Sequence, residues 1–350
     1  MDLWDWLNRP KSILVFPTYA HRAGGVAGAN WMVHLRVWLG RAREIDGFGQ
    51  LIARAVDDDG SLDAAEIALL GVRMADFTAD NDSREKVRFR FPGDPRAEVL
   101  KFDDRTDPNG LAEQTFTISA ARMREISAAQ GGTDGWLNVL AEVDEFSGEG
   151  RIKLLEPEGL SIVSDIDDTV KVTEIPAGPA IVLRNTFLRD YVAAAEMREL
   201  YRGYGPAAAF HYVSGGPWQL FRPVETFLID QEKFPPGTFH MKNVRRDLRD
   251  KNSWKDLKVL LGGGSTQEHK IDRISKLMQA CPKRKFILVG DSGEHDPEIY
   301  AQIRTMFPKQ VQEIIIRDVV DARSLKPQRL DGMTVIKAPT VEARPIRARS

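Results

Sequence analysis

Three features are scarce in this sequence, and each scarcity limits what the protein can be. The chain has a single cysteine, Cys281, among 350 residues, so it can form neither an internal disulfide nor a thiolate metal cluster. Acidic and basic side chains nearly balance, 51 against 49, so the composition indicates no nucleic acid partner. No apolar run approaches the ~18 residues of a membrane span. These absences predict a globular protein of a reducing, cytoplasmic compartment.

The amino-terminal stretch leaves two interpretations open. It lacks the charged flank and the long apolar centre of a secretion signal. Trp4 and Trp6 precede Arg9 and Lys11. This arrangement suits either packing of residues 1–16 into the protein's own core or contact with a lipid surface. We favour packing into the core, with a peripheral position at a membrane as the alternative.

The first 156 residues show the pattern of antiparallel strands. Apolar and polar residues alternate in "NWMVHLRVWL", "KVRFRF", "EQTFTI" and "WLNVLAEV", and turn clusters such as "DPNG" separate such stretches. Alternation with a period of two is typical of strands with one solvated face. Residues 1–156 are therefore predicted to form a β-rich, sandwich-like domain.

One helix is predicted inside this domain, from Asp63 to Phe77, because Asp63 and Glu66 have the spacing of a capping box. The stretch Ala55–Glu66 also approaches the pattern of a calcium-binding EF-hand loop. Ala55 stands at the first ligand position of that pattern and offers no carboxylate. We favour an acidic turn that leads into a capped helix, and calcium binding is the alternative.

From Glu158 onward, unbroken apolar runs alternate with helical segments. The runs "LSIVSD", "AAAFHYVSGG", "KFILVGDSG" and "EIIIRDV" are typical of strands that are buried on both faces. Residues 157–325 are therefore predicted to form an α/β domain with a Rossmann-like, doubly wound parallel sheet, whose ligands bind beyond the carboxyl ends of the strands. Residues 326–350 are predicted to be a mostly flexible tail, apart from the apolar stretch "MTVIKA".

Three aspartates within four positions follow the first of these runs, in "SIVSDIDDTVKV". Like charges at the end of a buried strand repel one another, and a divalent cation among them offsets the repulsion. Oxygen ligands select a hard ion, and Mg²⁺ is the usual one where phosphate is also bound. The aspartates therefore predict a magnesium site.

These acids form part of an ordered set of motifs. The pattern of Asp165, Asp167 and Thr169 resembles the first motif of the haloacid-dehalogenase superfamily of phosphotransferases. The further motifs of that superfamily follow in the expected order as Ser214 in "FHYVSGGPW", Lys270 in "QEHKIDRI", and Asp291 with Asp296 in "FILVGDSGEHD". Each residue alone has an ordinary structural explanation as a turn residue, a solvated lysine or a loop cap. Their joint order favours the catalytic interpretation.

Within the superfamily, residues 158–320 are most similar to the catalytic domains of the actin-patch-associated phosphatidate phosphatases. The resemblance implies a haloacid-dehalogenase type of fold and a nucleophilic role for Asp165, through an aspartyl-phosphate. It implies that Asp167 is the general acid and base, with a pKa raised toward neutrality. Asp168 is expected to support the loop instead of taking part in the chemistry.

The same resemblance implies the binding residues. The Mg²⁺ ligands would be Asp165, Asp291, Asp296 and Asp167, the last through its backbone carbonyl. The phosphate would be held by Thr169, Ser214, Gly215, Gly216 and Lys270.

The implied substrate is a phosphorylated molecule, and we favour a phospholipid at a membrane surface, with phosphatidate converted to diacylglycerol and phosphate. Two alternatives stay open at this point. One is a phosphatase for a soluble or macromolecular phosphomonoester, and the other is a non-catalytic scaffold protein.

Overall fold

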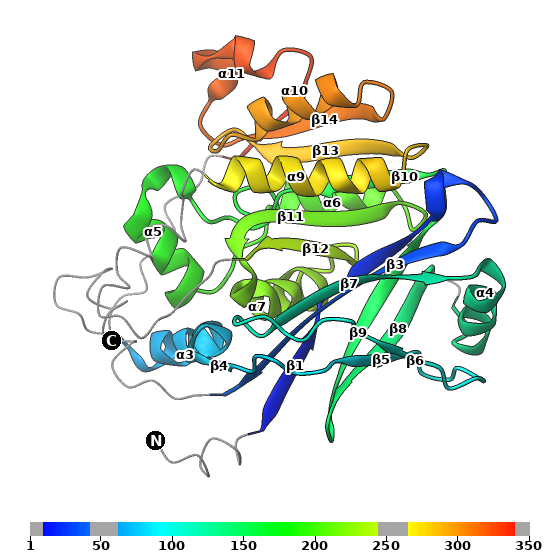
Figure 1. Cartoon of the computed structure of the whole chain (residues 1–350). Coiled ribbons are helices and arrows are strands. Elements are labelled where there is room, and N and C mark those ends of the chain that lie inside the picture. The colour runs from blue at the N-terminus through cyan, green and yellow to red at the C-terminus, as the bar shows by residue number, and fades with distance from the viewer. Residues whose placement is uncertain (1–9, 43–61, 133, 244–264, 340–350) are drawn as a thin grey trace.

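Two β-sheets of different kinds form the framework of the protein (Figure 1). The computed structural model describes residues 10–42, 62–132, 134–243 and 265–339. The first half of the chain forms a nine-stranded sheet, and the second half forms a six-stranded sheet. The interpretations of Trp4, Trp6 and residues 55–61 concern parts of the chain that lie outside the described ranges.

The nine-stranded sheet contains the strands β1 (Lys11–Val15), β2 (Thr18–Arg22), β3 (Trp31–Arg41), β4 (Asp80–Asn81), β5 (Arg88–Arg90), β6 (Val99–Lys101), β7 (Leu111–Ile118), β8 (Trp136–Val143) and β9 (Phe146–Leu155). The strand order is β1-β3-β2-β9-β8-β5-β6, and β4 and β7 also pair with β3. The β2–β9 pair is parallel and the other pairs are antiparallel. The predicted β-rich character is confirmed, and the strands are hydrogen-bonded into one sheet, in which β3 has partners along both of its edges.

The alternation along β3 sends successive side chains to different cores. Val33, Leu35 and Val37 are fully buried in the core of the nine-stranded sheet itself. Trp38 points to the opposite face, where its ring lies 4.9 Å from the ring of Trp218 in the second half of the chain. Both faces of this strand are therefore covered, one by its own sheet and one by the α/β part.

Two helices belong to the first half, α3 (Ala64–Thr78) and α4 (Ala120–Ala129), with a short turn η1 (Ala23–Gly25). The capping box predicted for α3 is confirmed. The Asp63 carboxylate accepts hydrogen bonds from the backbone N–H groups of Ala65 and Glu66, and the Glu66 carboxylate accepts one from the Asp63 N–H. Both acids thus satisfy backbone donors that would otherwise be unpaired at the helix start.

The six-stranded sheet contains β10 (Leu160–Ser164), β11 (Ala209–Pro217), β12 (Gly237–Lys242), β13 (Lys285–Asp291), β14 (Val311–Asp318) and β15 (Thr334–Lys337). All neighbouring strands are parallel, in the order β12-β11-β10-β13-β14-β15. The chain builds the sheet outward from β10 in one direction and then, from β13, in the other. The direction reverses between these two strands, where ligands of such sheets bind.

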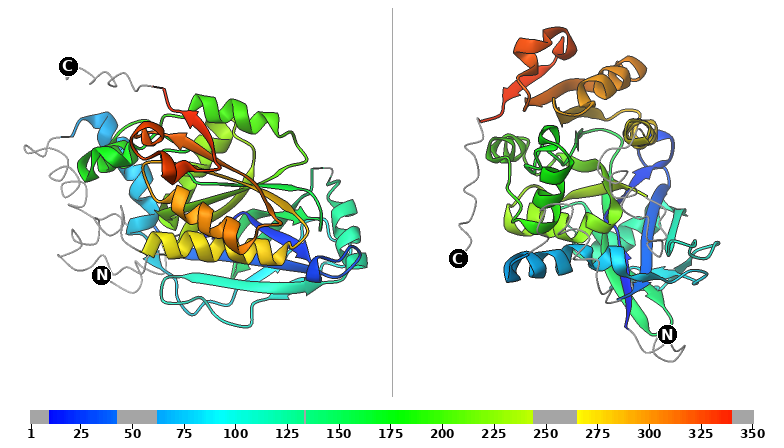
Figure 2. Two further views of the ribbon diagram at one scale, coloured as in Figure 1. Left: turned by 90° about the horizontal axis from the view of Figure 1, so that it is seen from above. Right: turned by 90° about the vertical axis from the view of Figure 1, so that its left-hand side faces the viewer.

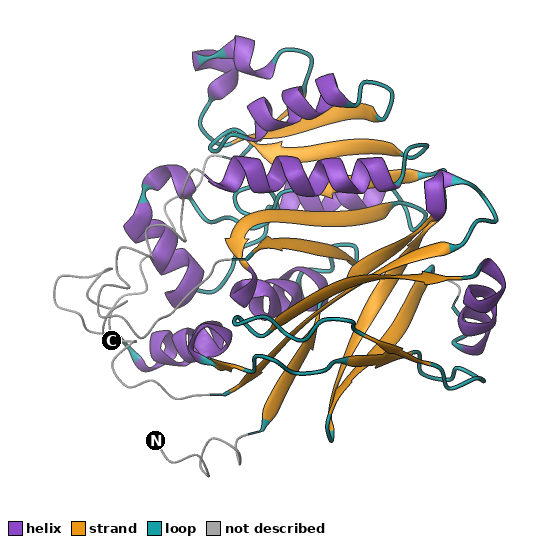
Figure 3. Ribbon diagram, viewed as in Figure 1, coloured by secondary structure: helices purple, strands orange, loops and turns teal. Residues whose placement is uncertain are grey.

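Helices cover both faces of the parallel sheet, as the sequence predicts (Figures 2 and 3). On one face α9 (Ser265–Ala280) and α10 (Asp296–Met306) pack against the strands, and on the other face lies α6 (Ala195–Gly203). Shorter elements complete this half: α5 (Pro179–Leu183), α7 (Phe221–Glu225), α11 (Ala322–Leu325), η2 (Ile175–Ala177), η3 (Arg184–Leu188), η4 (Trp218–Leu220), η5 (Thr226–Gln231) and η6 (Pro327–Leu330). None of the helices in the described part of the chain has the length and apolar character needed to cross a bilayer.

The parallel sheet continues beyond residue 325, where the sequence predicts a mostly flexible tail. The turn η6 buries Leu330, and β15 pairs with β14. Four residues of the apolar stretch "MTVIKA" form this strand. The stretch adds to the sheet because the edge of β14 offers unpaired backbone groups.

The two halves of the chain share a hydrophobic core. Phe16, between β1 and β2, packs edge-on against the ring of Trp218 at 5.9 Å and against Phe221 at 5.4 Å. A backbone hydrogen bond of 3.1 Å joins the Phe239 N–H to the Pro17 carbonyl. The nine-stranded sheet therefore packs directly on the elements that follow β11.

Five of the six histidines of the chain gather at the junction of the two halves. Around the ring of Tyr19, the centroids of His34, His240 and His211 lie at 4.5, 6.0 and 6.2 Å. His21 stacks on His34, and a ring nitrogen of His269 lies 3.3 Å from the His240 carbonyl. Burial lowers the pKa of each of these histidines. The junction therefore favours their neutral form.

Acidification is expected to destabilise the protein through this cluster. Burial lowers the pKa of His34 to about 4 and that of His211 to about 3. An unfolded histidine binds its proton near pH ~6.5, so below that pH the unfolded chain binds more protons than the folded one. The free energy of unfolding should fall by up to about 1.4 kcal/mol per pH unit for each such histidine as the pH drops toward the folded-state pKa. Urea unfolding at a series of pH values measures this slope.

The variant His211→Gln should show a smaller slope, because glutamine does not titrate. The matched control is His295→Gln, which replaces an exposed histidine outside the junction. Identical slopes for the unmodified protein and His211→Gln would contradict the assignment.

Candidate active site

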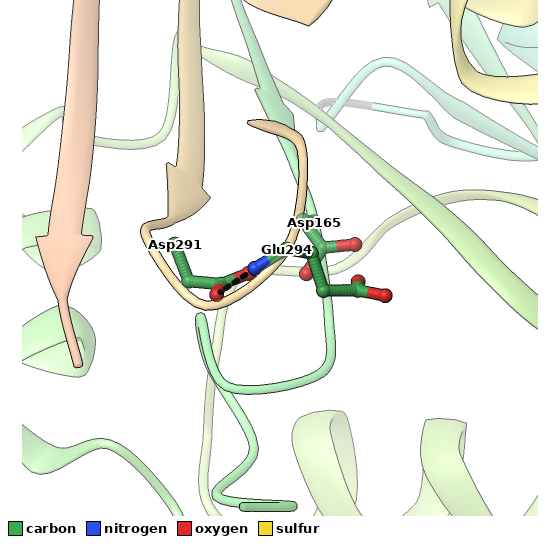
Figure 4. A group of neighbouring side chains, drawn as sticks. All are labelled: Asp165, Asp291 and Glu294. Atoms are coloured by element: carbon green, nitrogen blue, oxygen red, sulfur yellow. Dashed lines mark hydrogen bonds between the residues drawn. The ribbon is translucent and has the colours of Figure 1, made fainter. Parts of the chain in front are cut away.

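The carboxyl ends of β10 and β13 bring together acids that are far apart in the sequence. Asp165 directly follows β10, and its backbone N–H donates to the Val289 carbonyl of β13 at 2.9 Å. Asp291 is the last residue of β13. Carboxylate oxygens of Asp165, Asp291 and Glu294 all lie within 4.8 Å of one another (Figure 4). The structure thus places Asp165 and Asp291 at one site, as the motif order predicts.

Asp291 contributes a carboxylate oxygen that lacks a partner. Its Oδ1 accepts hydrogen bonds from the backbone N–H groups of Gly293 and Glu294, at 2.6 and 3.1 Å. Its Oδ2 is buried and has no hydrogen-bond partner among the described residues. Burial, and then the charges of Asp296 and Asp165, raise the pKa of this carboxyl well above its usual range. A hard cation would satisfy the orphaned oxygen and remove the repulsion, so the three acids fit such an ion.

Each carboxylate oxygen of Asp165 contacts a different side chain. Its Oδ1 lies 2.7 Å from the Nζ of Lys270, and its Oδ2 accepts a hydrogen bond of 3.2 Å from the Thr169 hydroxyl. Burial raises the pKa of Asp165 well above its usual range, although the Lys270 charge opposes the shift. Thr169 therefore contacts the carboxylate that the sequence predicts to be the nucleophile.

Lys270 projects from α9 into the middle of the acids, and its side chain is 1% exposed. Its Nζ also lies 2.5 Å from Oδ1 of Asp296 and 3.8 Å from Glu294. Burial alone would lower the pKa of this ammonium group, but the surrounding carboxylates raise it well above its usual range. Lys270 therefore stays charged and orients Asp165.

Asp296, which the resemblance implies as a metal ligand, lies outside the group of clustered carboxylates, and Glu294 belongs to that group. Asp296, at the start of α10, directs one oxygen to Lys270, and the other accepts the Asp291 backbone N–H at 3.3 Å. Glu294 instead joins the clustered carboxylates, and burial raises its pKa to about 7. Sequence reasoning missed Glu294, and the available signal was a third acid in the same loop, "GDSGEHD".

Asp167 differs from its expected state. Its Oδ1 lies 2.6 Å from the Nζ of Lys171 and accepts a hydrogen bond of 2.6 Å from the Thr173 hydroxyl. Burial raises the pKa of this carboxyl, but Lys171 and Thr173 outweigh burial and lower it below its usual value. The expected rise toward neutrality is therefore not seen. Sequence reasoning missed Lys171, because its position in an irregular loop follows no periodic pattern.

Asp168 supports the loop, as the sequence predicts. Its backbone has a left-handed conformation, with φ of 54°. Its carboxylate accepts hydrogen bonds from the backbone N–H groups of Thr173, Glu174 and Ile175, at 2.8, 2.7 and 2.6 Å. These bonds close the loop that carries Asp167 and Lys171.

Ser214, Gly215 and Gly216 form the end of β11. The buried Ser214 hydroxyl accepts a hydrogen bond of 2.9 Å from the Gly216 N–H. A Cβ atom on Gly215 would lie 2.2 Å from the side chain of Thr266 in α9, so only glycine allows this close approach. All three residues border the same cavity as Asp167.

This cavity, which we call the Asp167 cavity, is lined by both polar and apolar residues. The polar residues and glycines of the lining are Asp167, Lys171, Thr173, Thr186, Tyr191, Ser214, Gly215, Gly216, Thr266 and Glu294. The remaining lining is formed mainly by Ile166, Ile175, Val182, Pro217, Leu220, Val224 and Met241. The site thus combines a carboxylate cluster with an adjoining cavity that suits a ligand with a charged and an apolar part.

Comparison with known proteins relates this region to one family. Residues 160–318 match the family described as "Phosphatidate phosphatase APP1, catalytic domain". Phosphatidate phosphatase APP1 of Saccharomyces cerevisiae is 33% identical over 167 residues, which cover 47% of this chain and 26% of that protein. An uncharacterised protein of Schizosaccharomyces pombe is 28% identical over 173 residues, covering 49% of this chain and 27% of that protein.

The chain thus aligns with about a quarter of the length of these curated relatives. Among solved structures, a carbohydrate acetylesterase from Xanthomonas citri is 9% identical over 69% of this chain and 64% of its own, with a TM-score of 0.23. That likeness is too low to inform the fold. Residues 160–318, which hold the clustered acids and Lys270, are thus similar to the catalytic domain described for phosphatidate phosphatase APP1, the family that the motifs in the sequence resemble.

Proposed function

We propose that the protein is a magnesium-dependent phosphomonoester hydrolase with an α/β domain of the haloacid-dehalogenase type, and that its substrate is phosphatidate. The observation that carries the proposal is the meeting of Asp165, Asp291 and Lys270 at the point where the strand order reverses. The relationship of residues 160–318 to the APP1 catalytic domain supports phosphatidate as the substrate. The apolar residues that line part of the Asp167 cavity agree with a substrate that carries an apolar group.

The carboxylates of Asp165, Asp291 and Glu294 would hold the Mg²⁺ ion, together with the backbone carbonyl of Asp167. When bound, the cation supplies positive charge that allows a carboxylate and a phosphate, both anions, to approach each other. Asp296 would not be a metal ligand, because one of its oxygens accepts from Lys270 and the other accepts from the backbone N–H of Asp291.

The proposed reaction has two steps. A carboxylate oxygen of Asp165 attacks phosphorus, the bond between phosphorus and the alcohol oxygen breaks, and that oxygen takes a proton from Asp167. This step requires that Asp167 is protonated in the substrate complex, whereas Lys171 favours its ionised form in the free protein. Water then attacks the phosphorus of the aspartyl-phosphate, Asp167 takes a proton from the water, and phosphate leaves with Asp165 restored. Lys270 and Thr169 keep the attacking carboxylate in one orientation throughout.

Phosphate release should depend on Mg²⁺ and on both aspartates. The substrates are phosphatidate in mixed micelles and a panel of sugar and nucleotide phosphates, each assayed with Mg²⁺ and with excess chelator. The variant Asp165→Asn should lose at least about 1,000-fold in rate, because it removes the nucleophile, and Asp167→Asn should also be strongly impaired. Asp272→Asn, an exposed acid on α9, is the matched control and should retain full activity.

The two alternative functions correspond to different outcomes of this assay. A preference for sugar or nucleotide phosphates would replace the lipid with a soluble monoester. If neither the unmodified protein nor Asp165→Asn released phosphate from any ester, the result would favour a non-catalytic scaffold.

Removing the charge of Asp291 should have opposite effects on stability without and with Mg²⁺. Without divalent cations, Asp291→Asn should raise the free energy of unfolding by about 1 kcal/mol or more, because it relieves repulsion among buried carboxylates. Added Mg²⁺ should raise the unfolding temperature of the unmodified protein but not that of the variant. Thermal unfolding monitored by circular dichroism measures both effects, and Asp272→Asn serves again as the control. Equal stabilisation of both proteins by Mg²⁺ would contradict the proposed ligand set.

A further inference from the structure

The Asp167 cavity contains a cation that the sequence motifs do not include. Among the described residues that line this cavity, Lys171 is the only one with a positive charge. Its side chain is 3% exposed, and its Nζ lies 2.6 Å from the Asp167 carboxylate. Burying an ammonium group is costly unless a partner compensates it. The position of Lys171 therefore calls for a functional or a structural explanation.

The surroundings of Lys171 hold its ammonium group at one place. Its Nζ donates to the Thr173 hydroxyl at 2.5 Å and lies 4.9 Å from the ring centre of Tyr191. Its backbone N–H donates to the Ile166 carbonyl at 3.0 Å, and its carbonyl accepts the Asp168 N–H at 2.7 Å. Both ends of the residue are thus fixed, with the charge directed at the border of the cavity.

Lys270 is already committed to carboxylates. It pairs closely with Asp165 and Asp296, and Glu294 lies nearby. With Asp291, four ionised carboxylates would face the charges of Lys270 and one divalent cation, which leaves one negative charge uncompensated. A phosphate group that enters the site needs a further cation, and Lys171 stands on the cavity side of Asp167.

We propose that Lys171 binds the phosphate group of the substrate, and that it exchanges the Asp167 carboxylate for the phosphate when the substrate enters the cavity. This inference rests on the proposed function and adds a substrate-binding residue to it. In the free protein the Asp167 carboxylate pairs with Lys171, at the position that the substrate phosphate would take. Ser214 and the two glycines after it border the same cavity.

The apolar side chains that line the cavity suggest the chemistry of the rest of the ligand. Val182, Leu220, Val224 and Met241 are buried and line the cavity that Lys171 borders. A phosphate at Lys171 would place its ester group beside these side chains. The ligand class is therefore a phosphomonoester whose alcohol part is apolar next to the phosphate.

The first test measures binding of inorganic phosphate to the full chain by calorimetry in the presence of Mg²⁺. Lys171→Met should weaken binding by at least about 30-fold, as expected when one member of a buried charge pair is lost. Lys171→Arg keeps the charge and should bind phosphate more tightly than Lys171→Met. Lys276→Met, which removes an exposed lysine of α9, is the matched control and should bind like the unmodified protein.

The second test examines the exchange itself. Asp167→Asn removes the carboxylate that competes for Lys171, so this variant should bind inorganic phosphate more tightly than the unmodified protein. The gain should disappear in the double variant Asp167→Asn/Lys171→Met. That double variant leaves neither charge unpaired, so it keeps the comparison valid even if Lys171→Met alone fails to fold.

The outcomes separate this inference from the proposed function. If the unmodified protein binds phosphate and hydrolyses esters, and Lys171→Met binds phosphate with the same affinity, the role of Lys171 is overturned and the proposed function stands. If the tighter phosphate binding of Asp167→Asn persisted in the double variant, the role of Lys171 would likewise be overturned. If the unmodified protein neither binds phosphate nor hydrolyses any ester, the proposed function itself fails, and this inference fails with it.

Discussion

The ammonium group of Lys270, buried among carboxylates, is the interaction on which the candidate site depends. A buried charge is tolerated only with close partners, and Lys270 has Asp165 on one side and Asp296 on the other. This pairing requires α9, β10 and the start of α10 to meet within a few ångströms. Glycines make the approach possible: a Cβ on Gly290 would lie 2.3 Å from an oxygen of Asp296. The close packing of backbone at the end of the sheet thus serves the electrostatics of the site.

The site has two regions with different charge requirements. In the carboxylate cluster, negative charge exceeds positive charge, and burial raises the pKa of Asp165 and Asp291. In the Asp167 cavity, one acid and one lysine neutralise each other. The first region suits a hard cation, and the second suits exchange of one anion for another. Asp167 borders both, which is the position required of a residue that serves the leaving oxygen.

The first half of the chain supports the site, and none of its described residues belongs to the carboxylate cluster. Trp38 of β3 and Phe16 both pack on Trp218, which follows directly after the segment Ser214–Pro217. The buried ring of Trp218 thus connects the nine-stranded sheet to the end of β11, which carries Ser214 and its glycines.

The sequence by itself determined the parallel sheet, the capped helix after Asp63, and the presence of Asp165 and Asp291 at one edge. These features follow from local periodicity and from the rule that parallel strands end at the same side of a sheet, so order along the chain is sufficient to predict them. Only the tertiary structure decided that Glu294 joins the carboxylates while Asp296 holds Lys270, and that Lys171 pairs with Asp167. It also decided that β3 joins its neighbours into one sheet and that five histidines gather at the junction of the two halves. Side chains in irregular loops, and contacts between distant segments, take their directions from neighbours that no sequence period encodes.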